Sequence, residues 1–223
     1  MWNWPVERIH PLARDTINAD LLERGMEAGK GVLLLAPHLG NWEFLIHHVT
    51  RRHPITALYR PPRIAQMDTL IRSARARSGA TLVPATRRGI REVLRTLSAG
   101  GLVGILPDQQ PLQGHGVYAP FFHLPALTLT LVGALLRRTS ALPIFGWAQR
   151  NADGYDVHFR QAPDGLNDPD EVVAATCLNL GIEACVRHCP EQYTWSYRRF
   201  RTRPPEELEA VRRGEPPKVP YKS

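Results

Sequence analysis

The sequence predicts an α/β fold in which a central, mostly parallel sheet is flanked by helices. Short apolar runs typical of strands alternate along the chain with stretches typical of helices, and glycine or proline bounds many of them. The length of 223 residues, with 43% hydrophobic and 22% charged residues, fits one globular domain, or one domain with a tail.

The first half of the chain begins with a polar stretch near residues 15–28 that is typical of a helix. The apolar run 31–37, between glycine and proline, predicts a buried strand. After His38-Leu-Gly40, Asn41 is a good N-cap for a helix over 42–50. The next predicted elements are a strand at 55–59, a helix at 64–78, a strand at 81–84, a helix at 87–98 and a strand at 102–106.

The second half predicts a long loop over 110–125 and then a helix over 126–138. Two strands, 142–149 and 155–161, are expected to pair around the turn sequence Asn151-Ala-Asp-Gly154, and a long helix over 170–188 follows. We expect three regions: an N-terminal helical segment at 1–30, a main α/β domain at 31–200, and a charged, proline-rich tail at 201–223.

The net charge of +7 favours anionic partners such as an anionic lipid, a nucleic acid or an acidic protein. The alternative is an arginine-rich composition without functional meaning. The three cysteines, Cys177, Cys185 and Cys189, lack a fourth ligand and match no common zinc spacing. We therefore expect idle thiols in a reducing compartment.

The chain shows no transmembrane pattern and no signal peptide. The uncharged stretch 109–136 is interrupted by prolines, and its apolar end is shorter than the ~20 residues that a bilayer needs. It also lacks Gly-x-Ser-x-Gly, a Walker loop and His-Glu-x-x-His, which argues against a serine hydrolase, a P-loop nucleotide site and a zinc protease.

The most informative segment is Ala36-Pro-His-Leu-Gly-Asn-Trp-Glu-Phe44. His38 follows a predicted strand, and Glu43 lies in the first turn of the next helix, so the two side chains can meet. A carboxylate on one imidazole nitrogen fixes the tautomer and leaves the other nitrogen free as a base. The alternative is a purely structural pair, but in α/β sheets the carboxyl ends of strands are where sites form.

This block resembles the His-x4-Asp/Glu signature of the glycerolipid acyltransferase superfamily. Its residues Pro-His-Leu-Gly-Asn-Trp-Glu resemble the lipid A late acyltransferases, the lauroyl/myristoyl transferase family. Further segments agree in order, and together they cover residues 20–204: Tyr59-Arg60-Pro61; Arg72, Arg75 and Arg77; Gly104-Ile-Leu-Pro-Asp-Gln109; Gly116-Val-Tyr-Ala-Pro-Phe-Phe122; and Pro190-Glu-Gln-Tyr-Thr-Trp195 with Arg198-Arg-Phe200.

The resemblance implies acyl transfer without a covalent intermediate, no cofactor and no metal, with an acyl carrier protein thioester as co-substrate. His38 is then the general base on an acceptor hydroxyl, and Glu43 orients it. Arg75 is the candidate for stabilising the oxyanion or binding a phosphate, and Arg60 is the weaker candidate.

Two further groups of residues are candidates for the site. Asp108 and Gln109 follow a buried strand, where the carboxylate can hold an arginine or histidine, or instead cap a turn. The segment 114–119 matches the dinucleotide pattern G-x-G-x-x-A, but prolines replace the strand and helix that this pattern needs. The residues expected to line an acyl-chain groove, with ordinary loop packing as the alternative, are Trp42, Tyr118, Phe121 and Phe122.

The implied partners are the acyl carrier protein, an anionic lipid acceptor such as a lipid A precursor, and a membrane surface, but no nucleic acid. The implied location is the cytoplasmic face of the bacterial inner membrane, as a peripheral protein. Family members usually carry an N-terminal transmembrane helix, whereas only 37 residues precede His38 here. This points to a short form or to a start assigned too far downstream.

Three alternatives stay open at this point. The acceptor could be another lipid, such as a glycerolipid or an amino-acid lipid, because the same His–carboxylate pair would serve it. The chain could be a non-catalytic remnant that binds a lipid or the carrier protein. A nucleic-acid binder fits the charge, but the sequence contains no recognised nucleic-acid-binding module.

Overall fold

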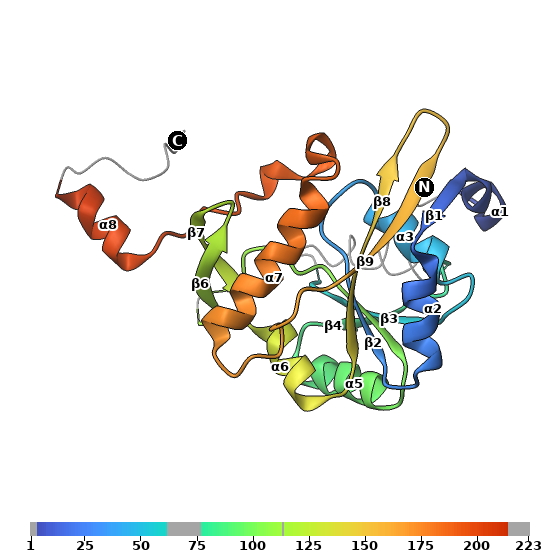
Figure 1. The fold of residues 1–223 in the computed structure, drawn as a ribbon, viewed down its shortest axis with the longest axis horizontal. Helices are drawn as coiled ribbons and strands as arrows, with labels where there is room; N and C mark the ends of the chain where they lie inside the picture. The colour runs from blue at the N-terminus through green and yellow to red at the C-terminus, as the bar shows by residue number, and fades with distance from the viewer. Residues whose placement is uncertain (1–3, 62–76, 113, 214–223) are drawn as a thin grey trace.

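A computed structural model describes residues 4–61, 77–112 and 114–213, which form a layered α/β structure (Figure 1). The helices are α1 (Val6–Ile9), α2 (Ala19–Glu27), α3 (Trp42–Val49), α5 (Arg87–Ser98), α6 (Leu131–Arg138), α7 (Glu171–Val186) and α8 (Pro205–Arg212), with 3-10 helices at His10–Leu12, Pro190–Gln192 and Trp195–Tyr197. The strands are β1 (Ala13–Ile17), β2 (Val32–Leu35), β3 (Ile55–Tyr59), β4 (Thr81–Pro84), β5 (Leu102–Ile105), β6 (Gly116–Phe121), β7 (Leu124–Leu129), β8 (Leu142–Arg150) and β9 (Tyr155–Gln161).

The main sheet has seven strands in the order β1-β9-β8-β2-β5-β3-β4. Its neighbours run parallel except for β8 and β9, which form the predicted antiparallel pair. The predicted α/β fold with a mostly parallel sheet is therefore confirmed. The central strand β2 pairs with β5 on one side and with β8 on the other, so the chain that leaves its carboxyl end lies in the middle of that edge.

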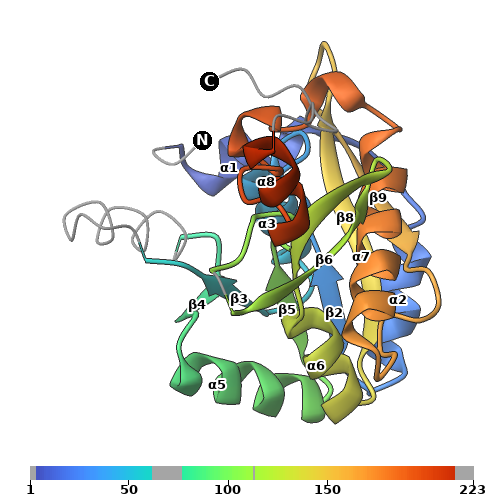
Figure 2. The ribbon, with the colours of Figure 1, turned by 90° about the vertical axis from the view of Figure 1, so that its left-hand side faces the viewer.

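Helices cover both faces of this sheet because the central strands are apolar on both sides (Figure 2). On β2, Leu33 and Leu35 pack in the cluster that contains α5, α6 and α7, whereas Val32 and Leu34 pack in the cluster that contains α2 and α3. This division follows from the two-residue period of a strand. All four side chains are at most 1% exposed, so truncating one of them to alanine is expected to cost about 2–5 kcal/mol.

The expected loop over 110–125 is wrong: residues 116–129 form the antiparallel hairpin β6–β7. The helix expected from residue 126 begins at Leu131, because 126–129 belong to β7. Phe122 and His123, with φ of 48° and 66°, make the two-residue turn without the glycine or asparagine that normally signals it. Pro120 and Pro125 face each other in the hairpin, where prolines argue against a central strand.

The N-terminal region also departs from the expected single helix near residues 15–28. Ala13–Ile17 is the edge strand β1, and helix α2 begins only at Ala19. The middle three residues of β1 are exposed and two of them are charged, so the strand lacks the apolar alternation that would identify it. The helix expected at 64–78 lies almost entirely outside the described residues.

Helix α8 projects away from the body of the molecule (Figure 1).

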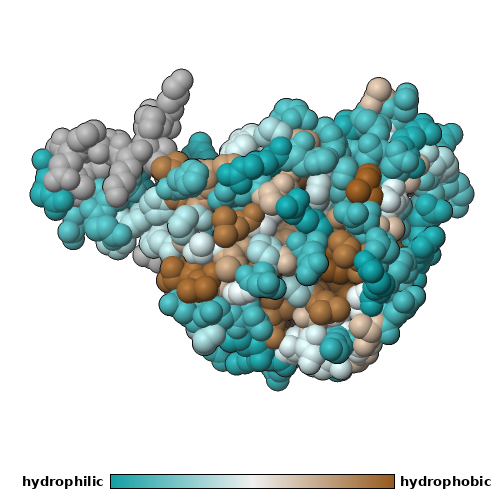
Figure 3. Space-filling view, in the orientation of Figure 1, coloured by the Kyte–Doolittle hydropathy of each residue, from teal (hydrophilic) through white to brown (hydrophobic). Residues whose placement is uncertain are grey.

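None of the helices in the described ranges has both the length and the apolar character needed to cross a bilayer. Figure 3 shows apolar patches over and beside α7, where Val172, Val173 and Leu180 are between 41% and 51% exposed.

Candidate active site

His38 occupies the loop between β2 and α3, at the carboxyl edge of the sheet. The predicted N-cap Asn41 starts α3, because its Oδ1 accepts the backbone N–H of Phe44 at 3.0 Å. Gly40 has φ of 61°, and a Cβ at this position would lie 2.0 Å from the carbonyl oxygen of Ala148. Only glycine therefore fits this turn. His38, just before it, is 5% exposed as a residue.

Asp108 holds the imidazole of His38. Its Oδ1 lies 2.8 Å from Nδ1 of His38, and its Oδ2 accepts the backbone N–H of His38 at 2.8 Å. The strand register explains why the two side chains meet. Leu35 of β2 pairs with Ile105 of β5, and His38 and Asp108 each lie three positions beyond these paired residues. With Nδ1–H donating to the carboxylate, the lone pair of Nε2 is the basic site of the ring.

Nε2 of His38 faces the side chain of Gln109. The side-chain amide Nε2 of Gln109 lies 3.4 Å from it and is placed to donate to it. The ring of Tyr197 lies edge-on to the imidazole at 4.5 Å between centroids, and that of Trp42 lies at 6.0 Å. Gln109 and Tyr197 are exposed, so an alcohol that displaced the Gln109 amide would reach the basic nitrogen.

Glu43 is predicted from the sequence to orient His38, and the carboxylate on Nδ1 in the structure is that of Asp108. Glu43 lies in the first turn of α3, as predicted, and is partly exposed. Asp108 follows the neighbouring parallel strand β5, and the sequence had left it open that this carboxylate holds an arginine or a histidine. A role for Glu43 in the reaction stays a prediction.

Of the two arginine candidates, only Arg60 belongs to the described residues. Arg60 directly follows β3 and is exposed at the same edge of the sheet as His38. Arg75 lies outside the described residues. Their expected roles on an oxyanion or a phosphate therefore stay predictions, whereas Asp108 and Gln109 are both brought to the imidazole.

The four residues expected in an acyl groove lie in different surroundings. Phe121 is 0% exposed and packs in the core, so it is not an open wall in this structure. Tyr118 donates its hydroxyl to the carbonyl oxygen of Arg203 at 2.6 Å. Phe122 is partly buried, with the Arg187 guanidinium 4.9 Å from its ring centroid. A groove role for Tyr118, Phe122 and Trp42 stays a prediction.

Two polar residues near the site were not singled out from the sequence. Tyr193 is 7% exposed and lies near the charge of the Asp108 carboxylate. Burial, together with the negative charge of Asp108, raises the pKa of Tyr193 and keeps the phenol neutral. Arg199 is 5% exposed, and burial lowers the pKa of its guanidinium. In the sequence, both residues belong to the segment 190–200, which matches the family pattern but suggested no role for either of them.

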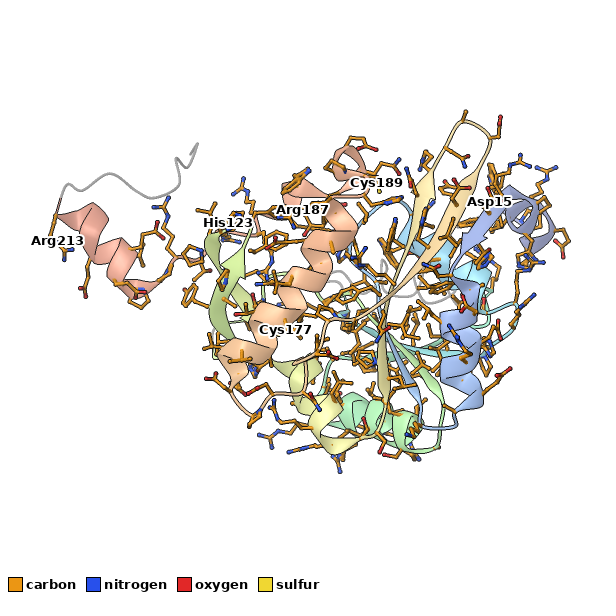
Figure 4. All side chains as sticks on the ribbon, in the orientation of Figure 1. Asp15, His123, Cys177, Arg187, Cys189 and Arg213 are labelled. Carbon is orange, nitrogen blue, oxygen red and sulfur yellow. The ribbon has the colours of Figure 1, made fainter. Side chains whose placement is uncertain are left out.

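The three cysteines lie on or just beyond α7, and all are free (Figure 4). Burial raises the pKa of Cys185 to about 12 and that of Cys189 to about 11, so both thiols are protonated at neutral pH. Within the described ranges, no group of three or more His, Cys, Asp or Glu side chains could hold a metal ion.

Two cavities lie away from His38. One, of about 590 Å³, lies between α2, the start of β8 and the loop after β9. The other, of about 280 Å³, lies between α2, the end of α3 and β1, and basic side chains line part of it.

Comparison with known proteins supports the family resemblance. Residues 1–202 match the sequence family described as bacterial lipid A biosynthesis acyltransferase. The chain is 30% identical over 206 residues to the lipid A biosynthesis palmitoleoyltransferase of Escherichia coli (strain K12), a match that covers 91% of this chain and 66% of that protein. It is 27% identical to the lauroyltransferase of the same organism, over the same shares of the two chains.

The myristoyltransferase of Escherichia coli (strain K12) is 26% identical over 212 residues, which cover 93% of this chain and 64% of that protein. The chain thus spans slightly less than two thirds of the length of these relatives. With its family match over most of its length and its expected fold confirmed, the chain belongs to the bacterial lipid A biosynthesis acyltransferase family.

Proposed function

We propose that this protein transfers a fatty acyl chain from a thioester to a hydroxyl group of a lipid A precursor, with His38 as general base. The observation that carries the proposal is the held imidazole: Asp108 occupies Nδ1, and Nε2 points toward the exposed side chains at the edge of the sheet. The acceptor class follows from the family, whose named members are lipid A acyltransferases.

In this reaction the acceptor hydroxyl takes the place of the Gln109 amide beside His38. Nε2 accepts the hydroxyl proton while the oxygen attacks the thioester carbonyl carbon. The buried Asp108 carboxylate stabilises the imidazolium that forms. When the tetrahedral intermediate collapses, the carbon–sulfur bond breaks and the imidazolium returns its proton to the leaving thiolate, so no acyl-enzyme forms.

The remaining groups have proposed roles around this step. Arg75, with Arg60 as the weaker candidate, would stabilise the oxyanion or bind a phosphate of the acceptor. Glu43 would support the base from α3. The acyl donor would be an acyl carrier protein, and the acceptor would be reached at the cytoplasmic face of the inner membrane. The net charge of +7 favours both an acidic carrier protein and an anionic lipid surface.

The test is a transfer assay with a labelled acyl carrier protein thioester and a lipid A precursor in mixed micelles. We expect wild-type protein to transfer the label and His38→Ala to lose about 10²–10⁴-fold in rate. The control is His53→Ala, because His53 is also bonded to a carboxylate, Glu23, but precedes β3 and so lies at the opposite edge of the sheet from His38.

Two outcomes would contradict the proposal. Wild-type transfer that His38→Ala leaves largely intact would show that the base is another group. Binding of the carrier protein without transfer to a lipid A precursor or to another hydroxylated lipid would favour a non-catalytic binding protein.

A further inference from the structure

Two adjacent residues of one loop contact both nitrogens of the His38 imidazole. Asp108 Oδ1 lies 2.8 Å from Nδ1, and the side-chain amide nitrogen of the next residue, Gln109, lies 3.4 Å from Nε2. The loop follows β5, and the register of β5 with β2 brings it beside His38. The loop that orients the base therefore also brings an amide donor to the nitrogen that would take the proton.

The backbone around these groups is fixed on both sides of His38. Asp108 is 1% exposed, and its Oδ2 accepts the backbone N–H of His38 at 2.8 Å. Beyond His38, the N–H of Gly40 donates to the carbonyl of Gln192 at 3.1 Å. The N–H of Thr194 donates to the carbonyl of His38 itself at 3.0 Å. A donor carried by such a backbone needs little reorganisation during a reaction, which is what makes stabilisation of an oxyanion effective.

The side chain of Gln109 is exposed and has a single contact. Among the described residues, its only hydrogen bond is the one with His38, and 3.4 Å is long for such a bond. Gln192 shows the opposite case: its side chain accepts the N–H of Arg150 at 2.8 Å and donates to the carbonyl of Arg150 at 2.9 Å. The amide of Gln192 joins two segments, whereas the amide of Gln109 can turn to a new acceptor.

The proposed transfer creates a negative charge that needs a donor of this kind. When the acceptor hydroxyl attacks the thioester, the carbonyl oxygen becomes an oxyanion, and donors about 2.7–3.1 Å from that oxygen stabilise it. The attacking oxygen takes the place of the Gln109 amide beside Nε2 of His38. The displaced amide then lies next to the carbon under attack, to which the oxyanion is bonded.

We propose that Gln109 is a catalytic residue whose side-chain N–H binds the carbonyl oxygen of the acyl thioester and stabilises the oxyanion that forms there. This inference rests on the proposed function. In the free protein the amide binds the base, and in the complex it turns to the oxygen. When the carbon–sulfur bond breaks, the oxygen regains its double bond, so Gln109 exchanges no proton. This role leaves Arg75 and Arg60 to bind a phosphate of the acceptor.

The experiment compares Gln109→Ala with Gln161→Ala in the transfer assay. Both glutamines are exposed, but Gln161 ends β9 and pairs with Ile144 near the start of β8, at the opposite edge of the sheet from His38. We expect Gln109→Ala to lower kcat about 10²-fold and to change KM less than about threefold, because the lost contact forms in the transition state. Gln161→Ala should keep both constants, and both variants should melt as wild type does.

A binding measurement separates a donor to the oxyanion from a group that only positions His38. The probe is the monomethyl ester of a long-chain alkylphosphonic acid, a stable anion with tetrahedral phosphorus in place of the attacked carbon. The control ligand is the neutral fatty acid methyl ester of the same chain length. Gln109→Ala should bind the phosphonate about 10²-fold less tightly than wild type and the methyl ester equally well.

The outcomes distinguish this inference from the proposed function. Suppose that wild-type protein transfers acyl chains and His38→Ala does not. A kcat of Gln109→Ala within about threefold of wild type then overturns the role of Gln109 and leaves the proposed function standing. A lower kcat with wild-type affinity for the phosphonate also overturns it, because Gln109 would then only position the base. If wild-type protein transfers nothing, the proposed function is overturned, and weaker phosphonate binding by Gln109→Ala would still support the contact with a tetrahedral anion.

Discussion

Two histidines of this protein are bonded to carboxylates, and their surroundings differ. His38 and Asp108 meet at 2.8 Å, with side chains that are 6% and 1% exposed. His53 and Glu23 meet at 2.9 Å, with side chains that are 18% and 33% exposed. Glu23 also accepts a hydrogen bond from Arg52 Nη1 at 3.1 Å. Asp108 instead accepts hydrogen bonds from both the backbone N–H and the ring of His38. The two His–carboxylate contacts are thus of similar length but differ in burial and in the other groups that bind the carboxylate.

The positions of the two pairs explain the difference. His38 follows the central strand β2 at its carboxyl end, and its Nε2 is directed toward exposed groups. In the other pair, Nε2 is the nitrogen bonded to Glu23, and the contact ties α2 to the segment after α3. The first pair leaves a basic nitrogen available to a substrate, whereas the second uses it to join two elements.

The largest expected difference between the pairs is in catalysis. Asp108→Asn should lower kcat of the proposed transfer by at least about 10²-fold, because the amide no longer fixes the Nδ1–H tautomer or stabilises the imidazolium. Glu23→Gln should change kcat less than twofold in the same assay. Equal losses in the two variants would mean that the buried pair has no special role.

The region of the second pair should also control acid stability. Burial, followed by the charges of Arg51 and Arg52, lowers the pKa of His48 from 6.5 to about 4. The unfolded chain therefore binds a proton that the folded chain does not, and the free energy of unfolding falls as pH drops from 6.5 toward 4. This one group corresponds to about 3 kcal/mol at most.

His48→Gln should flatten that dependence when urea unfolding is measured between pH 7 and pH 4. Part of the slope should persist in the variant, because burial also lowers the pKa of His10, His47 and His158. A slope identical to that of wild type would show that His48 binds its proton equally in both states.

The smallest expected effect is on the stability supplied by Glu23. Although burial raises the pKa of Glu23, hydrogen bonds from Arg52 and His53 lower it below its ordinary value. Glu23→Gln should reduce the free energy of unfolding by less than about 1 kcal/mol at pH 7, and less again in 1 M salt. A loss of several kcal/mol would place this pair among the buried interactions of the core.

The sequence predicted most of the sheet because its central strands are short apolar runs between glycine or proline. It also placed His38 correctly, since a strand followed by an N-cap defines the loop between them. The partner of His38 could not be predicted from local spacing: Asp108 is brought to it by the pairing of β2 with β5. The hairpin β6–β7 was missed because Phe122 and His123 make a turn that usually needs glycine or asparagine.

Tyr193 and Arg199 illustrate a second limit. Nothing in their own neighbourhood predicts a polar role, because the partners of Arg199 come from β7 and α7, and the charge that Tyr193 lies near comes from Asp108, beyond the end of β5. Only the tertiary structure shows that the side chains of Tyr193 and Arg199 are buried.

The contact of residues 192–194 with the loop that carries His38 has a consequence for how the protein is made. During synthesis, the ribosome releases His38 early, but its carbonyl finds its partner only when Thr194 has emerged, and its ring meets Tyr197 only after that. A nascent or proteolytically shortened chain could therefore hold a nearly finished sheet while its imidazole is still unaligned, so enzymatic competence would be acquired at the end of folding rather than with the core.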